Sequence, residues 1–355
     1  MRLNADQFME KLLADGVVDD ADVSGEDLRG ADLRGAVVNR ADFSSCRFDE
    51  ADLRDTVLNG CRFDRASLRG AGLSGAIVIN CVLFHADLGN AQLQKAMFSE
   101  CKIEQVSCAG ADLTDTMLHG CEILNSSFRS AKLQCTMFAN CKWFAPDLSD
   151  CELDRTVLLG ADLRSARFDG SSFKSAQLMG AKLTGLSFAS RSLQLTQFIN
   201  ADLTGCDFSE ADVRQANFQG AVMTGAKFRQ STADTAIFLE CTLTDADFTQ
   251  SSLRNSIFVE AKMAGARFNA ADLYQAIFHH ADGARCGFAG CDLTYADFSH
   301  ACLAEADFVD ASMFRAKLHG ADTRGARFTD RERALENDPD LLEAENWRPV
   351  DIEFR

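Results

Sequence analysis

Five cysteines recur at intervals of twenty residues, and thiols in such a column could hold a soft metal ion. They are Cys61, Cys81, Cys101, Cys121 and Cys141. The chain lacks the Cys-x-x-Cys pairs that are typical of zinc sites, and alanine or serine takes the same position in other repeats. Because a buried cysteine behaves as a small hydrophobe, we predict that these thiols are core side chains.

A second column combines carboxylates with imidazoles, which are ligands for a divalent ion such as zinc. Glu240, Glu260, His280 and His300 recur every twenty residues, and His279 and His319 are expected close by. The alternative to a metal site is a ladder of solvated polar side chains. We favour the ladder because the sequence indicates no pocket, and we predict no cofactor.

A glycine pattern could also indicate chemistry, since Gly70, Gly72 and Gly75 match the G-x-G-x-x-G of dinucleotide-binding loops. Neither a preceding parallel strand nor a following helix is indicated, so no backbone amides would point at a phosphate. The sequence also contains no Ser-His-Asp, H-E-x-x-H or P-loop pattern. These observations argue against an enzyme.

The element that positions all of these residues is a five-residue sequence repeat. A large apolar residue falls on every fifth position, and a small residue stands two places before it, as in Ala201-Asp202-Leu203. Neither a helix of period 3.6 nor a flat strand of period 2 has this spacing. A repeat of five shows an additional period of twenty only if residues twenty apart stack on one face, so the recurrence of cysteine and phenylalanine every twenty residues predicts coils of four pentapeptides. The expected core ladder is phenylalanine at twenty-residue spacing: Phe168, Phe188, Phe208, Phe228, Phe248, Phe268, Phe288, Phe308 and Phe328.

The motif resembles that of the pentapeptide-repeat family, which reads approximately Ala-Asp/Asn-Leu/Phe-x-x. Ala31-Asp32-Leu33-Arg34-Gly35 and Ala161-Asp162-Leu163-Arg164-Ser165 match it, and the register runs from about Ala21 to Phe328. The resemblance implies an all-β fold, a right-handed quadrilateral parallel β-helix (solenoid) of about 15 coils with short helical caps at both ends. A filled solenoid offers no natural concave site, so we predict no enzymatic activity.

Three segments are expected: an N-terminal capping helix (residues 1–20), the β-helix (21–328) and a C-terminal helical cap or tail (329–355). Asn4 can cap a helix that stops at Gly16. Its apolar stripe consists of Phe8, Met9, Leu12 and Leu13. Caps of this kind shield the end coils of a solenoid.

The C-terminal segment contains its own helix start at Asp338-Pro339. Leu341, Leu342 and Trp347 give this tail apolar side chains to bury. A lid is the expected role; dimerisation is the alternative, because the C-terminal ends pair in several proteins of the family that the chain resembles. Within the repeat, Gly283 replaces a large central residue and predicts a local bend or a soft coil.

Composition limits the partners. The net charge of -17 argues against a surface that binds nucleic acid directly. No apolar run is long enough to span a membrane, and the start of the sequence lacks an apolar signal segment. We therefore expect a cytoplasmic protein in which the fourteen cysteines are reduced.

One side of the expected solenoid is apolar on the outside, at the residue just before the central one and at its flanks. On the other three sides this outer position is mostly polar. A stripe of this size indicates a protein partner or a second copy of the chain. The apolar face consists of Val37, Val57, Ile77, Ile79, Met97, Met117, Met137, Val157, Leu159, Ile199, Ile237, Leu239, Ile257, Val259 and Ile277.

Two functions follow as expectations. The first is a non-enzymatic scaffold or adaptor that binds protein through the apolar face. The family that the chain resembles includes accessory proteins of bacterial secretion systems, so such a role is one expectation. The second is an acidic mimic of duplex DNA that binds a type II topoisomerase, DNA gyrase or topoisomerase IV, as some proteins of the family do. Interleaved basic residues such as Arg34, Arg54 and Arg214 argue against the mimic.

Overall fold

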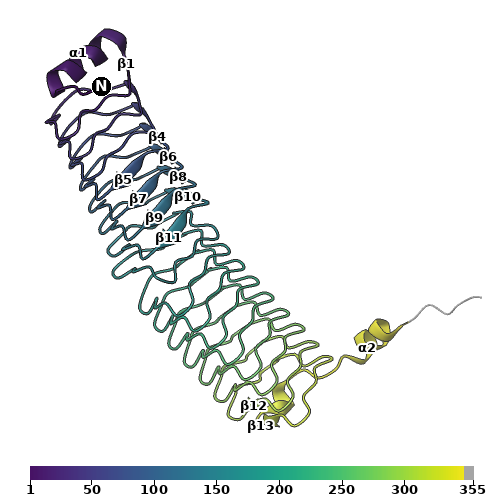
Figure 1. The fold of residues 1–355 in the computed structure, drawn as a ribbon. Helices are drawn as coiled ribbons and strands as arrows, with labels where there is room; N and C mark the ends of the chain where they lie inside the picture. The colour runs from purple at the N-terminus through teal and green to yellow at the C-terminus, as the bar shows by residue number, and fades with distance from the viewer. Residues whose placement is uncertain (348–355) are drawn as a thin grey trace, which may run out of the picture. The chain divides into compact units, whose positions relative to one another are not determined.

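The computed structural model describes residues 1–347, and it divides the chain into two units. Unit 1 comprises Met1–Thr184 and Arg191–Asp202, and unit 2 comprises Gly185–Ser190 and the chain from Leu203 onward. Each unit is a parallel β-helix (Figure 1). The fold class that the family resemblance implied is therefore confirmed.

Each coil has four sides, because four separate parallel ladders join residues that lie twenty apart. In unit 1 the ladders include the pairs Asp22–Asp42, Asp27–Arg47, Asp32–Asp52 and Val37–Val57. In unit 2 they include Asp207–Lys227, Asp212–Thr232, Asn217–Ile237 and Val222–Thr242. The residues that pair are the outward ones, so the small and large residues on either side of each point inward.

The longest ladder is a seven-stranded sheet on one side of unit 1, in the order β1-β2-β3-β4-β6-β8-β10. A four-stranded sheet, β11-β9-β7-β5, forms another side, and unit 2 contains the pair β12-β13. The first sheet consists of β1 (Val17–Asp19), β2 (Val37–Asn39), β3 (Val57–Asn59), β4 (Ile77–Ile79), β6 (Met97–Ser99), β8 (Met117–His119) and β10 (Met137–Ala139). The others are β5 (Val82–Phe84), β7 (Lys102–Glu104), β9 (Glu122–Leu124), β11 (Lys142–Phe144), β12 (Asp307–Phe308) and β13 (Arg327–Phe328).

The sides are joined by tight turns with one residue in the left-handed conformation. In one of them the Ala31 amide donates to the Leu28 carbonyl at 3.1 Å, and Gly30 between them has φ +63°, as a type II turn requires. Other corners hold non-glycine residues in the same conformation, such as Arg40 at φ 52°. The ladders on both sides of each corner compensate for this strain.

Phenylalanine rings fill the core of unit 2 in two columns. Phe228 stacks on Phe208 and on Phe248, each at 4.7 Å between ring centroids. It meets Phe218 and Phe238 of the other column edge to face, at 5.7 and 5.9 Å. The structure buries every ring of the expected ladder except Phe328, which is half-buried in the last coil.

The coil that contains Gly283 keeps its ladder, so no bend is observed there. Asp282 pairs with Lys262 and with Cys302 in the usual register. A Cβ on Gly283 would lie 3.2 Å from the tips of Met263 and Leu303. These two flexible side chains occupy the space that the missing central residue leaves.

The N-terminal helix is confirmed as α1 (Ala5–Asp15), with Asn4 in a capping box with Gln7 and Gly16 at the C-cap. It buries Phe8, whose ring meets Phe43 edge to face at 5.6 Å, so the helix covers the first coil. Leu13 is 82% exposed and does not belong to the buried stripe, contrary to expectation. The strand β1 follows α1 directly and pairs with β2.

The C-terminal segment does not cover its end coil with the expected apolar residues. The 3₁₀ helix η1 (Arg331–Arg333) places the Arg331 guanidinium 4.8 Å from the centre of the Phe328 ring. The helix α2 (Pro339–Asn346) starts with Asp338 as its N-cap, as predicted, but Leu341 and Trp347 are 48% and 71% exposed. This helix lies beside the coils and not over their end, and residues 348–355 lie outside the described part (Figure 1).

Within residues 1–347, neither helix has the length and the apolar character that a membrane crossing requires.

Candidate functional site

The predicted apolar column forms one continuous ladder in unit 1. Strand pairing places its first six members in register, from Val37 to Met137, and a further bridge joins Met137 to Val157. Next in the ladder come Gln177 and Gln197, which end the apolar column. Figure 1 shows the strands β4, β6, β8 and β10 following one another along this side.

None of the fifteen side chains of the apolar face is buried. Met117 and Met137 are 40% and 39% exposed, Leu159 is exposed, and the remaining members are half-buried against their neighbours in the ladder. The sequence-based prediction missed Val17, which pairs with Val37 and is exposed. Val17 lies twenty residues before Val37, so the repeat could have revealed it. It was missed because it directly follows Gly16, where the N-terminal helix ends.

Unit 2 contains a shorter part of the apolar face. Ile237, Ile257 and Ile277 pair in register, and the next residue in this ladder is Asp297. Leu239 and Val259 flank the isoleucines and are half-buried. The face in unit 2 is therefore three rungs long and ends at an acidic residue.

On the other sides, some of the acidic residues are paired with an arginine of the same pentapeptide. In unit 1, Arg34 lies 2.7 Å from the Asp32 carboxylate, and the same arrangement brings Arg54 to Asp52 at 2.6 Å. The hydrogen bonds from Arg34 lower the pKa of Asp32 to about 2. These sides therefore present ion pairs and not a uniform row of negative charge.

The cysteine column lies inside unit 1, as predicted. Cys61, Cys81, Cys101 and Cys121 are buried, and Cys141 is half-buried. Each thiol lies within hydrogen-bonding distance of backbone carbonyls; the Cys81 thiol, for example, lies 3.4 Å from the Leu58 carbonyl oxygen and 3.3 Å from that of Ile79. These contacts fit small core side chains.

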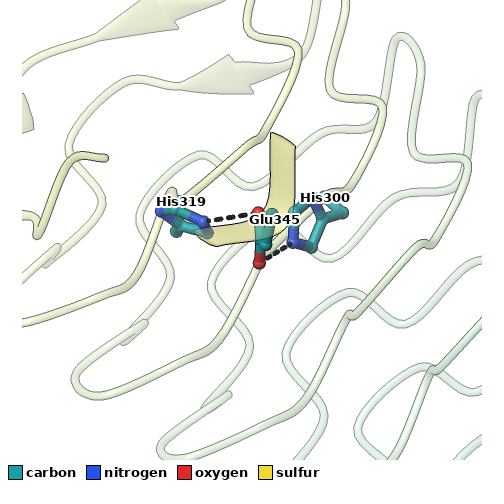
Figure 2. A group of neighbouring side chains, drawn as sticks. All are labelled: His300, His319 and Glu345. Atoms are coloured by element: carbon teal, nitrogen blue, oxygen red, sulfur yellow. Dashed lines mark hydrogen bonds and ion pairs between the residues drawn. The ribbon is translucent and has the colours of Figure 1, made fainter. Parts of the chain in front are cut away.

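The column of Glu240, Glu260, His280 and His300 does not converge on a point. The rings of His280 and His300 stack at 5.1 Å between centroids with 11° between their planes. The lone pairs of an imidazole lie in the ring plane, so stacked rings cannot direct their nitrogens at one ion. The structure instead brings His300 together with His319 and Glu345 (Figure 2).

This cluster, His300, His319 and Glu345, joins α2 to the last coils of unit 2. Oε1 of Glu345 lies 3.3 Å from Nε2 of His300, and Oε2 lies 3.1 Å from Nε2 of His319. The His319 ring is buried, and its Nδ1 accepts the backbone N–H of Asp338 at 3.1 Å. Nε2 of His319 therefore carries the ring hydrogen and donates a hydrogen bond to Oε2 of Glu345. The hydrogen bond from His319 lowers the pKa of Glu345.

An open pocket of about 720 Å³ adjoins the cluster in unit 2. Its wall includes Asp297, Lys317 and, from the C-terminal segment, Pro339 and Leu341. Lys317 lies 3.1 Å from the Asp297 carboxylate. Burial opposes ionisation of Asp297, but hydrogen bonds from Ser299, His279 and Lys317 prevail and lower its pKa to about 2. The sequence-based expectation that the chain has no concave site is therefore wrong here. The helix α2 lies beside the coils, and the pocket is formed between the two.

The sequence alone indicated only part of this cluster. His300 and His319 lie nineteen residues apart, which places them on adjacent coils, and both were noted for that proximity. Glu345 was missed because it follows the end of the repeat, where no periodicity relates it to the coils. Its position depends on how α2 packs.

Three models of one repeat family match most of the chain. The model described as a pentapeptide repeat region matches residues 53–128 and 191–268. Models described as pentapeptide repeats match residues 147–185 and 291–330 (eight copies) and residues 27–67 (nine copies). No curated protein matches the chain.

Several solved structures share the repeat. HetL, a pentapeptide repeat protein involved in heterocyst differentiation regulation in Nostoc sp. strain PCC 7120, is 20% identical, with 94% of each chain covered and a TM-score of 0.21. QnrB1, a plasmid-mediated fluoroquinolone resistance protein, is 21% identical over 58% of this chain and 90% of its own, with a TM-score of 0.25. A pentapeptide repeat protein from the Arabidopsis thaliana thylakoid lumen is 28% identical over 29% of this chain and 68% of its own, with a TM-score of 0.23. We draw nothing about function from these likenesses, because all three TM-scores are low.

Proposed function

Because the chain belongs to the pentapeptide-repeat family, we propose that it is a non-enzymatic scaffold that presents the flat sides of its β-helix to other proteins. The apolar face of unit 1 is the proposed contact surface. Its partner is another protein or a second copy of this chain.

The observation that carries this proposal is the exposed part of the ladder from Val17 to Val157. Eight successive coils place an apolar side chain at the same outward position. Two of these side chains, Met117 and Met137, are exposed to solvent. A preference of strands for β-branched residues would act on all four sides, whereas this column is confined to one. A contiguous apolar surface on a folded chain is typical of a site that another protein covers.

The experiment that tests this proposal introduces charge at two exposed positions on adjacent coils. The double variant Met117→Asp with Met137→Asp should abolish the complex that wild-type protein forms, whether the complex is found by affinity capture from native cells or as a higher molar mass in light scattering. The fold should survive, because both side chains point outward. In unit 2 the pair Ile237→Asp with Ile257→Asp tests the shorter part of the face in the same way.

A matched control carries the same substitution to another side of unit 1. Gln92→Asp with Lys132→Asp changes two exposed residues in a polar ladder and adds at least as much negative charge. This variant should keep the complex. An unchanged partner list and an unchanged mass for the methionine variant would refute the proposal.

The second candidate is the DNA mimic, and the observation that favours it is the net charge of -17. A mimic should inhibit DNA gyrase in a supercoiling assay, and its inhibition should weaken as salt screens the acidic sides. The Arg34–Asp32 type of ion pair counts against it, because a row of phosphates has no such compensation.

We also propose a cytoplasmic location. The cysteine column from Cys61 to Cys141 consists of free thiols in the structure, and free thiols persist where the environment is reducing. Mass spectrometry of the alkylated protein from native cells should find these five cysteines unpaired.

A further inference from the structure

We propose that His300, His319 and Glu345 bind a divalent transition-metal ion of the zinc type, and that this ion fixes α2 to the last coils of unit 2. The inference goes beyond the scaffold function and does not rest on it. It concerns a different part of the chain and a different chemistry.

The spacing of the three side chains fits such an ion. Zinc holds imidazole nitrogens and carboxylate oxygens at about 2.0 to 2.2 Å, so that ligand atoms in a tetrahedral site lie about 3.3 Å apart. Oε1 of Glu345 lies 3.3 Å from Nε2 of His300, and its other oxygen, Oε2, lies 3.1 Å from Nε2 of His319. All three ligand atoms lie within 4.8 Å of one another, and both rings turn the same nitrogen towards the carboxylate (Figure 2).

The two rings are held in place by their surroundings. The His300 ring is stacked on that of His280 and meets that of His319 edge to face, at 5.3 Å between centroids. Gly320 leaves the space that the His300 ring occupies, since a Cβ there would lie 2.4 Å from its Nδ1. Rigid, pre-oriented imidazoles lose little freedom when an ion binds.

The donor set also selects the class of ion. Two imidazoles and one carboxylate suit zinc, cobalt or nickel, whereas magnesium and calcium prefer oxygen ligands alone. The adjoining pocket leaves the metal side of the cluster open to water, which can supply a fourth ligand. The pocket is lined by four acidic residues and one lysine: Asp297, Glu336, Asp338, Glu345 and Lys317. This excess of negative charge favours a cation.

Binding should also change the start of α2. In the metal-free arrangement Nδ1 of His319 accepts the Asp338 amide, and the ring proton is on Nε2. An ion bound to Nε2 requires the ring hydrogen to be on Nδ1. The N–H at Nδ1 would then face the backbone N–H of Asp338, and two donors cannot form a hydrogen bond. The Asp338 amide must then shift, and Asp338 is the N-cap whose Oδ1 accepts the amides of Asp340 and Leu341. The metal is therefore coupled to the conformation of this helix.

The experiment is a titration of the full chain, treated first with a chelator and then dialysed, with zinc chloride in a calorimeter. We expect one site per chain, and we expect His300→Gln and Glu345→Gln each to weaken binding at least tenfold. Glu343→Gln is the matched control, since Glu343 is an exposed carboxylate of the same helix, and it should bind as wild type does. These side chains lie at the edge of unit 2, and circular dichroism checks that each variant keeps its fold.

A second readout separates this site from the thiols. Cobalt bound by two imidazoles and a carboxylate should give weak visible bands without the strong near-ultraviolet absorption of a thiolate ligand. Amide hydrogen exchange in α2 should slow when zinc is added to wild type and not when it is added to Glu345→Gln. Absence of saturable binding, equal binding by Glu345→Gln, or thiolate absorption with cobalt would each overturn the proposal.

Discussion

The core of unit 2 should respond strongly to the loss of one phenylalanine ring. Phe228 is fully buried between Phe208 and Phe248 and touches two further rings edge to face. Removing the ring in Phe228→Ala forfeits about 1.5 to 3 kcal/mol of burial. The strands above and below are held about 4.8 Å apart by their hydrogen bonds, so the coils cannot close the space, and a cavity cost is added. We expect a total loss of about 3 to 5 kcal/mol in the free energy of unfolding.

The assay is urea unfolding followed by circular dichroism, with the slope compared between variants to check that the same unit unfolds. Phe314→Ala is the matched control. Phe314 lies on the outside of unit 2, 39% exposed, with the Arg333 guanidinium 5.3 Å from its ring centre. Its loss should cost about 1 kcal/mol or less. Equal losses for the two variants would show that the stacked rings do not carry the stability of the coils.

Three further predictions concern individual side chains. Burial opposes ionisation of Asp247, but Thr249, Arg229 and Arg267 donate to it and lower its pKa to about 2. Because this folded pKa lies below the unfolded value of about 4, the carboxylate contributes about 2 kcal/mol above that value, and the contribution is lost as the pH falls through about 2. The difference in unfolding free energy between wild type and Asp247→Asn should therefore shrink between pH 6 and pH 2, and a constant difference would contradict this. Asn4→Ala removes the capping box of α1 and should cost about 1 kcal/mol, seen as faster amide exchange in that helix but not in the coils. Burial raises the pKa of the Cys108 thiol to about 12, so this cysteine should resist alkylation at pH 8 until urea unfolds the protein; rapid labelling of the native chain would show that the core opens.

The fold could be predicted almost entirely from the sequence, because each pentapeptide repeats the same pattern of residue types. A small residue, an outward residue and a large residue set the inward and outward positions, and the fixed spacing sets the register of Val37 on Val57 without any long-range information. The helix α1 was also predictable, since Asn4, Gln7 and Gly16 are local signals. The division into residues 1–20, 21–328 and 329–355 remains a prediction.

The parts that the sequence did not reveal depend on side-chain packing and on contacts outside the repeat. Gly283 suggested a local bend, but Met263 and Leu303 have flexible tips that reach into the space, and a pattern of residue types does not show this. Likewise, the apolar residues of α2 suggested a lid, whereas the contacts of Glu345 and Asp338 with His319 hold the helix beside the coils. Polar contacts of this kind have no periodicity that a sequence pattern could report.

The central claim is that protein is bound through the apolar face of unit 1, and the salt dependence of binding tests it most directly. The dissociation constant of the wild-type complex should be measured at about 50 mM and at about 500 mM salt, which shortens the screening length several-fold. Binding through Val, Ile and Met side chains should change by no more than about twofold, because burial of apolar surface is not screened. Weakening by tenfold or more, with a type II topoisomerase as the bound protein, would contradict the scaffold and support the acidic mimic.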